Sequence, residues 1–193
     1  MPGRFEDFLR GGRIIAAVRN ADMLRRAVES QVSAVFMLGA ELIEIGRMVD
    51  IARSAKKPVF VHVDLIEGLA GDQAGIRFLA RQIRPEGIIT TRQHLVNAAH
   101  KERLLAVQRL FIVDSQALAT GVGTVNAGRP DAVEVMPGIM PRVIAEACAR
   151  LDVPVIAGGL IQSAREIEQA LRAGACAVSL SRQELWGYGT QSG

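Results

Sequence analysis

Val155-Ile156-Ala157-Gly158-Gly159-Leu160-Ile161-Gln162-Ser163 is an apolar run that ends in two glycines and leads into a helix start. The run is β-branched and uncharged, which is typical of a buried strand. Ser163 and Glu166 have the spacing of a capping box, in which each side chain bonds a backbone amide at the start of a helix. The stretch therefore predicts one strand–loop–helix unit.

Two explanations fit the paired glycines of this loop. Gly158 and Gly159 can simply make a tight turn, because glycine tolerates unusual backbone angles. They can also let a ligand approach the backbone, because no Cβ stands in the way, and exposed amides before a helix suit a phosphate. The loop alone does not decide between a turn and a phosphate site.

The same strand-then-helix pattern recurs along the chain. Eight apolar runs predict buried strands at 14–18, 34–38, 58–65, 87–91, 104–111, 132–136, 153–159 and 177–180, and the third of them is expected to be the longest. A helix signal follows each run. The predicted helix caps are Asn20, Asp72, Asp114 or Ser115, Ser163, and Ser181 in a second Ser-x-x-Glu box. Gly121 and Gly123 are expected to weaken the helix after the fifth strand.

Eight such units predict a single α/β domain, a closed (β/α)₈ TIM-type barrel spanning 1–193. The loops must be short, because barrels of this kind usually need about 250 residues. We expect 1–13 to be an entry segment and 188–193 a frayed tail. A doubly wound open sheet is the rival architecture, but it does not need an eighth unit.

The composition indicates a soluble, cytoplasmic, globular protein. Hydrophobic residues make up 49% of the 193 residues, no apolar run is long enough to span a bilayer, and the N-terminus lacks a signal-peptide pattern. We expect Cys148 and Cys176 to be reduced core residues. The chain has 20 Arg and 3 Lys. Arginine suits phosphate and base recognition, but an arginine- and alanine-rich genome is the favoured explanation of the bias.

Function in such a barrel gathers at the C-terminal ends of the strands, and phosphate sites commonly use the loops after strands seven and eight. Gly158 and Gly159 follow the seventh predicted strand, and Ser181 and Arg182 follow the eighth. These four residues are therefore predicted to bind a phosphate. Ser181 can serve as a helix cap at the same time.

A second polar group is predicted at the mouth of the barrel, from strand ends elsewhere in the chain: Arg19, Asp64, Arg92, Arg109 and Glu134. The arginines can pair with the two carboxylates in a structural network, because buried charge is costly without a partner. Alternatively, the carboxylates accept hydrogen bonds from ligand hydroxyls. We expect His62 to be a satisfied core histidine. The sequence contains no metal-ligand motif, no cofactor fingerprint and no convincing catalytic constellation.

Six blocks, in order, resemble the glycerol-3-phosphate-responsive antiterminator family of bacterial glycerol uptake operons. The resemblance covers 14–188 and is carried by Val61-His62-Val63-Asp64-Leu65-Ile66-Glu67-Gly68, Gly87-Ile88-Ile89-Thr90-Thr91-Arg92, Gln108-Arg109-Leu110-Phe111 with Asp114-Ser115, Glu134-Val135-Met136-Pro137-Gly138, Ala157-Gly158-Gly159-Leu160-Ile161 and Ser181-Arg182-Gln183-Glu184-Leu185-Trp186. The family tends to have a proline before its first-strand arginine, whereas this chain has Ala16-Ala17-Val18-Arg19.

The resemblance implies a barrel that binds glycerol 3-phosphate and acts on the leader mRNA of glycerol-utilisation genes, so that transcription passes a terminator. It implies RNA binding without a catalysed reaction, and it transfers no RNA-contacting residues. One alternative is a barrel enzyme for a small phosphorylated substrate, with Asp64 and Glu134 as acid and base. Another is a degenerate barrel that only binds a protein partner.

Overall fold

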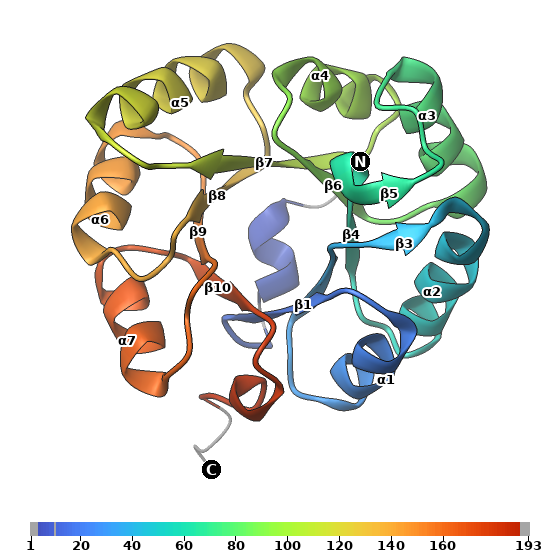
Figure 1. The fold of residues 1–193 in the computed structure, drawn as a ribbon, viewed down its shortest axis with the longest axis horizontal. Coiled ribbons are helices and arrows are strands. Elements are labelled where there is room, and N and C mark those ends of the chain that lie inside the picture. The colour runs from blue at the N-terminus through green and yellow to red at the C-terminus, as the bar shows by residue number, and fades with distance from the viewer. Residues whose placement is uncertain (1–3, 10, 190–193) are drawn as a thin grey trace.

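The computed structural model describes residues 4–9 and 11–189, which contain a closed parallel barrel (Figure 1). In barrel order, the strands are β1 (Ile14–Val18), β10 (Ala177–Leu180), β9 (Val155–Gly158), β8 (Ala132–Met136), β7 (Leu105–Phe111), β6 (Gly87–Thr90), β4 (Val59–His62) and β2 (Ala34–Met37). β2 pairs back with β1. This closure confirms the predicted (β/α)₈ barrel and excludes the open sheet, which would have two unpaired edges.

Helices cover the outside of the barrel. They are α1 (Ala21–Glu29), α2 (Leu42–Ser54), α3 (Gln73–Phe78) with the π-helical η3 (Leu79–Ile83), α4 (Gln93–Lys101), α5 (Ser115–Gly128), α6 (Pro141–Arg150) and α7 (Ala164–Arg172). The predicted caps Asn20, Asp72, Asp114 and Ser163 are confirmed, since each side chain accepts a hydrogen bond from an amide in the first turn of its helix. No helix among the described residues is both long and apolar enough to cross a bilayer.

The third predicted strand is shorter than expected, and β7 is the longest strand of the barrel. β4 ends at His62, and a 3₁₀ turn, η2 (Val63–Leu65), follows it. In this turn the Asp64 carboxylate accepts a hydrogen bond from the Thr91 amide at 2.8 Å, which ties the turn to the end of β6. β5 (Ile66–Glu67) then pairs with β3 (Ala40–Glu41) in a small separate sheet above the barrel.

α5 is continuous over its whole length, and its expected weakening by Gly121 and Gly123 stays a prediction. Gly121 lies against the barrel, where an added Cβ would approach Leu110 Cδ1 to 3.0 Å. One local expectation was wrong. Ser181 does not cap a helix: the last 3₁₀ turn, η4 (Gln183–Leu185), begins after Arg182 and has no side-chain cap. Of the predicted tail, Tyr188 donates to the Glu168 carboxylate at 3.2 Å, and 190–193 lie outside the described residues.

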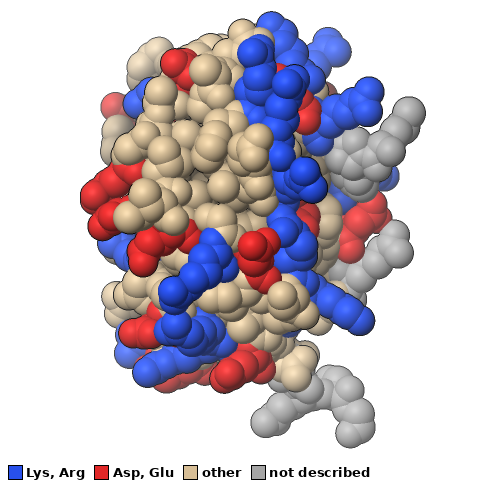
Figure 2. All heavy atoms as spheres, turned by 90° about the vertical axis from the view of Figure 1, so that its right-hand side faces the viewer, with Lys and Arg blue, Asp and Glu red and all other residues tan. Residues whose placement is uncertain are grey.

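Four consecutive helical segments end in a basic residue with left-handed backbone angles. Lys56, Arg84, Arg103 and Arg129 have φ values of 57°, 58°, 63° and 48°. Glycine usually takes this position, as Gly174 does after α7, because a side chain there costs about 1–2 kcal/mol. Figure 2, which faces the side of α2 and α3, shows Lys and Arg side chains gathered in a band along one edge of the barrel.

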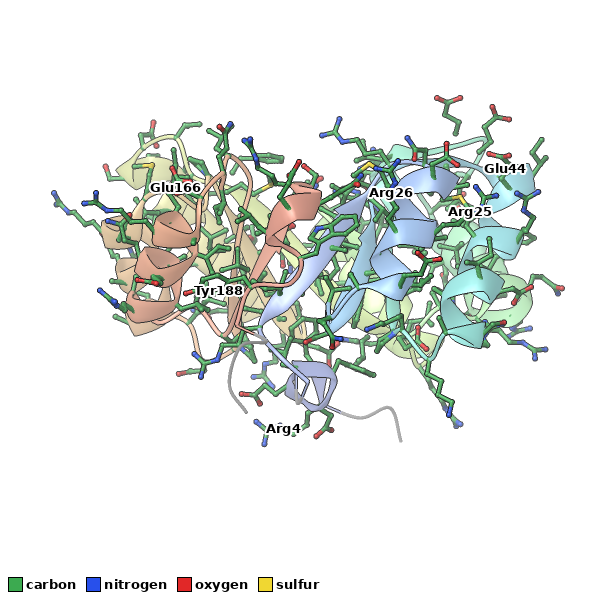
Figure 3. All side chains as sticks on the ribbon, turned by 90° about the horizontal axis from the view of Figure 1, so that it is seen from below. Arg4, Arg25, Arg26, Glu44, Glu166 and Tyr188 are labelled. Atoms are coloured by element: carbon green, nitrogen blue, oxygen red, sulfur yellow. The ribbon has the colours of Figure 1, made fainter. Side chains whose placement is uncertain are left out.

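The N-terminal end of the barrel is closed by the entry segment. The 3₁₀ turn η1 (Phe5–Leu9) lies beneath the strands, at the opposite edge from Arg26 and Glu166 (Figure 3). Its Phe5 and Phe8 rings meet the Phe60 ring edge-on, with centroids 5.3 and 5.8 Å apart, and Phe36 packs on the same ring at 5.7 Å. This aromatic layer fills the lower half of the barrel, so any ligand site must lie above it.

We predict that Gly87→Ala destabilises the barrel. Gly87 lies beside the aromatic layer, and an added Cβ would be 2.6 Å from the Leu105 carbonyl oxygen and 2.7 Å from the Phe60 ring. Overpacking of a tight core costs about 1–3 kcal/mol of unfolding free energy, which urea denaturation measures.

Gly123→Ala is the matched control. Gly123 is an exposed position within α5, and an added Cβ there would meet nothing within 4 Å. Alanine there should raise the unfolding free energy by about 0.5–1 kcal/mol. Equal effects of the two substitutions would contradict the described packing around Phe60.

Candidate functional site

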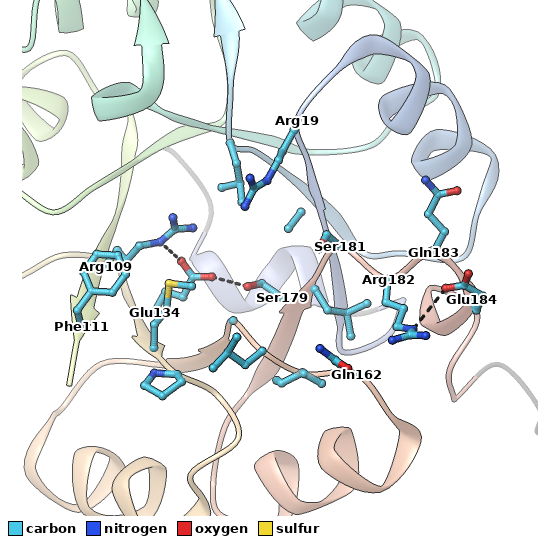
Figure 4. Close-up of a pocket in the computed structure, with 18 of the residues that line it drawn as sticks. Arg19, Arg109, Phe111, Glu134, Gln162, Ser179, Ser181, Arg182, Gln183 and Glu184 are labelled. Atoms are coloured by element: carbon cyan, nitrogen blue, oxygen red, sulfur yellow. Dashed lines mark hydrogen bonds and ion pairs between the residues drawn. The ribbon is translucent and has the colours of Figure 1, made fainter. Parts of the chain in front are cut away.

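A cavity of about 960 Å³ opens at the C-terminal ends of β1, β7, β8, β9 and β10 (Figure 4). It is open to solvent above the aromatic layer. The predicted site residues that line it are Arg19, Arg109, Glu134, Gly159, Ser181 and Arg182. Residues from strand ends far apart in the sequence thus meet because the barrel closes. Gly158, Asp64 and Arg92 do not line this cavity.

A buried ion pair forms the floor of the cavity. Arg109 Nε donates to Glu134 Oε2 at 2.6 Å, and the two side chains are only 6% and 1% exposed. Ser179 donates its hydroxyl to the other oxygen, Glu134 Oε1. A buried carboxylate is tolerated only with such partners. Figure 4 shows the terminal nitrogens of Arg109 directed away from Glu134, toward the open cavity.

The two glycines of the opening stretch have different positions. Gly158 lies against the ion pair, and a Cβ there would overlap the Glu134 carboxylate and lie 2.8 Å from Ser179 Oγ. Its lack of a side chain therefore makes room for Glu134. Gly159 has a φ of 78° and lines the cavity itself. The carbonyls of both glycines accept from the Gly138 amide, at 2.6 and 3.1 Å.

Polar groups without strong partners face the cavity from its other side. Ser181 has no hydrogen bond to any described residue, and Arg19 has no ion pair with one. Arg182 lies 3.8 Å from the exposed Glu184 carboxylate, a pair too loose and solvated to contribute much. Arg26 also lines the cavity and donates to Gln183 at 2.8 Å. This wall combines positive charge with an available hydroxyl.

Asp64 and Arg92 form an ion pair, which is the first of the two alternatives that the sequence allowed for this carboxylate. Asp64 Oδ1 lies 3.5 Å from Arg92 Nε, and the carboxylate also accepts from the hydroxyls of Thr90 and Thr91. These bonds hold the turn between β6 and α4. Asp64 does not line the cavity that Glu134 lines, so the geometry gives little support to the acid–base pair of the enzyme alternative.

His62 is buried but not fully satisfied. It is 2% exposed, and its Nδ1 has no hydrogen-bond partner among the described residues. Burial, together with the nearby Arg109 charge, lowers the pKa of His62 to about 4. The imidazole is therefore neutral near pH 7 and leaves the Arg109–Glu134 pair undisturbed.

Several cavity residues were not predicted from the sequence. Ser179 is the most informative, because a serine at an inward position in the apolar run 177–180 signals a buried polar partner. Phe111 and Leu160 form an exposed apolar rim, at 58% and 64% exposure. No spacing rule marks them, since Phe111 is simply the last residue of β7 and Leu160 follows the end of β9.

Metal and thiol chemistry find little support in the described part of the chain. No group of three or more His, Cys, Asp or Glu side chains there is arranged to hold a metal ion. Cys148 and Cys176 are free and half-buried, and burial raises the pKa of Cys176 to about 12. Both therefore stay protonated thiols near neutral pH.

The geometry suits recognition of a small anion with hydroxyl groups. Arg19, Arg182 and the Ser181 hydroxyl can donate to a phosphate. The Arg109 terminal nitrogens and the remaining lone pairs of Glu134 can meet hydroxyls deeper in the cavity.

Comparison with known proteins agrees with the family resemblance found in the sequence. The model of the family described as glycerol-3-phosphate responsive antiterminator matches residues 14–186. The uncharacterized protein YgcP of Escherichia coli K12 is 33% identical over 178 residues, which are 92% of this chain and 93% of that protein.

Two solved structures share the fold and much of the sequence. A glycerol uptake operon antiterminator regulatory protein from Listeria monocytogenes has a TM-score of 0.87 and 36% identity, covering 90% of this chain and 94% of that one. A glycerol uptake operon antiterminator-related protein from Thermotoga maritima has a TM-score of 0.80 and 30% identity, covering 90% and 97%. The chain therefore belongs to the glycerol-3-phosphate-responsive antiterminator family.

Proposed function

We propose that this protein binds glycerol 3-phosphate in the cavity at the strand ends and, in response, binds the leader mRNA of glycerol-utilisation genes as a transcription antiterminator. The observation that carries the proposal is the pairing of a cationic wall with a buried, polar floor in one cavity. Membership of a regulatory family supports the same function. Its place of action would be the cytoplasm, where leader mRNA is made.

The phosphate would lie against Gly159, Ser181 and Arg182, with Arg19 on the neighbouring end of β1. Gly159 lines the cavity, and the Ser181 hydroxyl has no partner among the described residues. Guanidinium groups bind phosphate oxygens through charge-assisted hydrogen bonds, which are stronger than neutral ones. The dianion would thus replace solvent around two arginines that lack tight protein partners.

The glycerol hydroxyls would reach the Arg109–Glu134 pair. Each Glu134 oxygen has one protein donor, Arg109 on one and Ser179 on the other, so lone pairs remain for a ligand hydroxyl. Inorganic phosphate would fill only the cationic wall. The floor therefore gives the site its preference for a phosphorylated polyol over phosphate alone.

Ligand can control RNA binding only if it binds one state of the protein more tightly than another. The loops that carry Gly159 and Ser181 are joined to β9 and β10, so closure of these loops on the ligand is a change that the barrel can transmit. Antitermination then follows if the bound RNA is held in the form that lacks the terminator hairpin.

We predict that Arg182→Ala weakens binding of glycerol 3-phosphate about 10- to 100-fold, because a hydrogen bond to a charged group contributes about 1.5–3 kcal/mol. Arg19→Ala should have an effect of similar size. Isothermal titration calorimetry with glycerol 3-phosphate measures both, with glycerol and inorganic phosphate as weak-binding comparisons.

Arg165→Ala is the matched control, since Arg165 is exposed on α7 and does not line the cavity. It should bind glycerol 3-phosphate as the unchanged protein does. Equal loss in Arg165→Ala and Arg182→Ala, or no heat from the unchanged protein, would refute the proposed site.

We also predict that glycerol 3-phosphate tightens binding to leader RNA, at least tenfold, and that Arg19→Ala removes this response without removing basal RNA binding. The reason is that Arg19 would sense the ligand rather than the RNA. A gel-shift titration of a labelled leader transcript measures the RNA affinity of each protein with and without ligand.

An unrelated transcript of equal length serves as the RNA control. If ligand strengthened binding to both transcripts equally, or if Arg19→Ala responded normally, the coupling described above would be wrong. Release of phosphate or glycerol from the ligand during the assay would instead favour the enzyme alternative.

A further inference from the structure

The end of the barrel opposite the cavity carries a row of basic residues, here called the basic arc. It follows the ends of α2, η3, α4 and α5, which are neighbours around the barrel, and consists of Arg53, Lys56, Lys57, Arg81, Arg84, Lys101, Arg103 and Arg129. Figure 2 shows a band of Lys and Arg side chains along one edge of the side covered by α2 and α3, whereas Asp and Glu side chains are mixed with Lys and Arg toward the opposite edge. Arg77 lies next to the arc, where it pairs with the same Glu102 carboxylate as Arg81.

The carboxylates of these loops are directed inward and are already engaged. Glu86 accepts from the Val59 amide at 2.7 Å, and Asp131 accepts from the Ala106 amide at 2.8 Å and contacts His100. Glu102 pairs with Arg77 and Arg81. Within the described residues, Lys56, Arg103 and Arg129 have no ion-pair partner. Arg53 also pairs with Asp50, so the charge that the fold does not neutralise lies at these residues rather than over the whole arc.

The backbone gives a second, independent sign. Lys56, Arg84, Arg103 and Arg129 all occupy left-handed positions, where glycine would fit without strain. α7 ends with glycine at the equivalent place, Gly174. Leu160 is also left-handed, so the strain by itself does not require a charge. A basic residue at this position in four helical segments nevertheless favours a use of the charge outside the fold.

We infer that the basic arc is the surface that holds the RNA backbone, an inference that rests on the proposed function. Packed helices lie 8–10 Å apart, so four successive helix ends span about 25–30 Å. Cations spread over such a length match an extended polyanion rather than one small anion. Glu41, Glu44 and Glu67 at the other edge of the same side would repel RNA there.

The placement separates the two ligands of the protein. Glycerol 3-phosphate would lie at the C-terminal ends of the strands, and RNA at the N-terminal ends. RNA would then not cover the cavity, so ligand could enter and leave while RNA stays bound.

The test is a fourfold variant, Lys56→Gly, Arg84→Gly, Arg103→Gly and Arg129→Gly. It removes four charges and supplies the residue that the backbone prefers, so the melting temperature should stay the same or rise. A lost phosphate contact weakens binding about fivefold or more at 0.1 M salt, so RNA affinity should fall at least about a hundredfold. The slope of log affinity against log salt should become shallower by about 3.

The matched control replaces four exposed arginines on the other half of the barrel by glutamine: Arg142, Arg150, Arg165 and Arg172. The net charge changes equally, but RNA affinity should fall by no more than about threefold. Fluorescence anisotropy with a labelled leader transcript measures RNA binding, and calorimetry checks that both variants still bind glycerol 3-phosphate.

The outcomes separate the inference from the proposed function. If the unchanged protein binds no RNA, the proposed function fails and this inference with it. If it binds RNA and the glycine variant binds equally well, or the control loses as much, the basic arc is not the RNA surface, although the proposed function stands. A stable glycine variant that loses RNA but keeps glycerol 3-phosphate supports the inference.

Discussion

The buried ion pair between Arg109 and Glu134 is the interaction on which the upper half of the barrel depends. Glu134 has almost no exposed surface, so its charge requires both Arg109 and the Ser179 hydroxyl. That requirement fixes the ends of β7, β8 and β10 relative to one another. It also explains why position 158 is glycine, since any side chain there would occupy the space of the carboxylate. The ion pair at the floor of the cavity is thus required by the packing of the barrel itself, independently of any ligand.

The two halves of the barrel interior have opposite characters. Below, Phe5, Phe8, Phe36 and Phe60 pack edge to face and exclude water. Above, the interior is polar and opens to solvent. A short chain achieves this division because the entry segment supplies the lower plug, so the strands need only four to seven residues each.

Much of this organisation could be predicted from the sequence, and the failures have physical causes. Hydrophobic periodicity and helix caps located all eight strands, since both are local signals. The family could also be identified from short blocks. The role of position 64 was harder to predict. Asp64 and Glu134 were both expected at the mouth of the barrel, but Asp64 bonds Thr91 and Arg92, whereas Glu134 points inward. The side of the barrel that a polar residue faces depends on where a strand ends, and strand ends depend on such tertiary bonds. The left-handed backbone of the four basic residues could not be predicted from the sequence, because glycine is the residue that usually marks this conformation.

β7 and β8 connect the two charged ends of the molecule. β7 begins just after Arg103 and carries Arg109, and β8 begins just after Arg129 and carries Glu134. The strands are paired to each other along their length, from Val107 with Ala132 to Phe111 with Met136. In the proposed function, a ligand bonded to the Arg109 guanidinium would change the bonding at one end of these paired strands, whose other end leads to the basic arc. Coupling over a barrel of this size would then need no large rearrangement, because a small shift of the two paired strands would move Arg103 and Arg129 together.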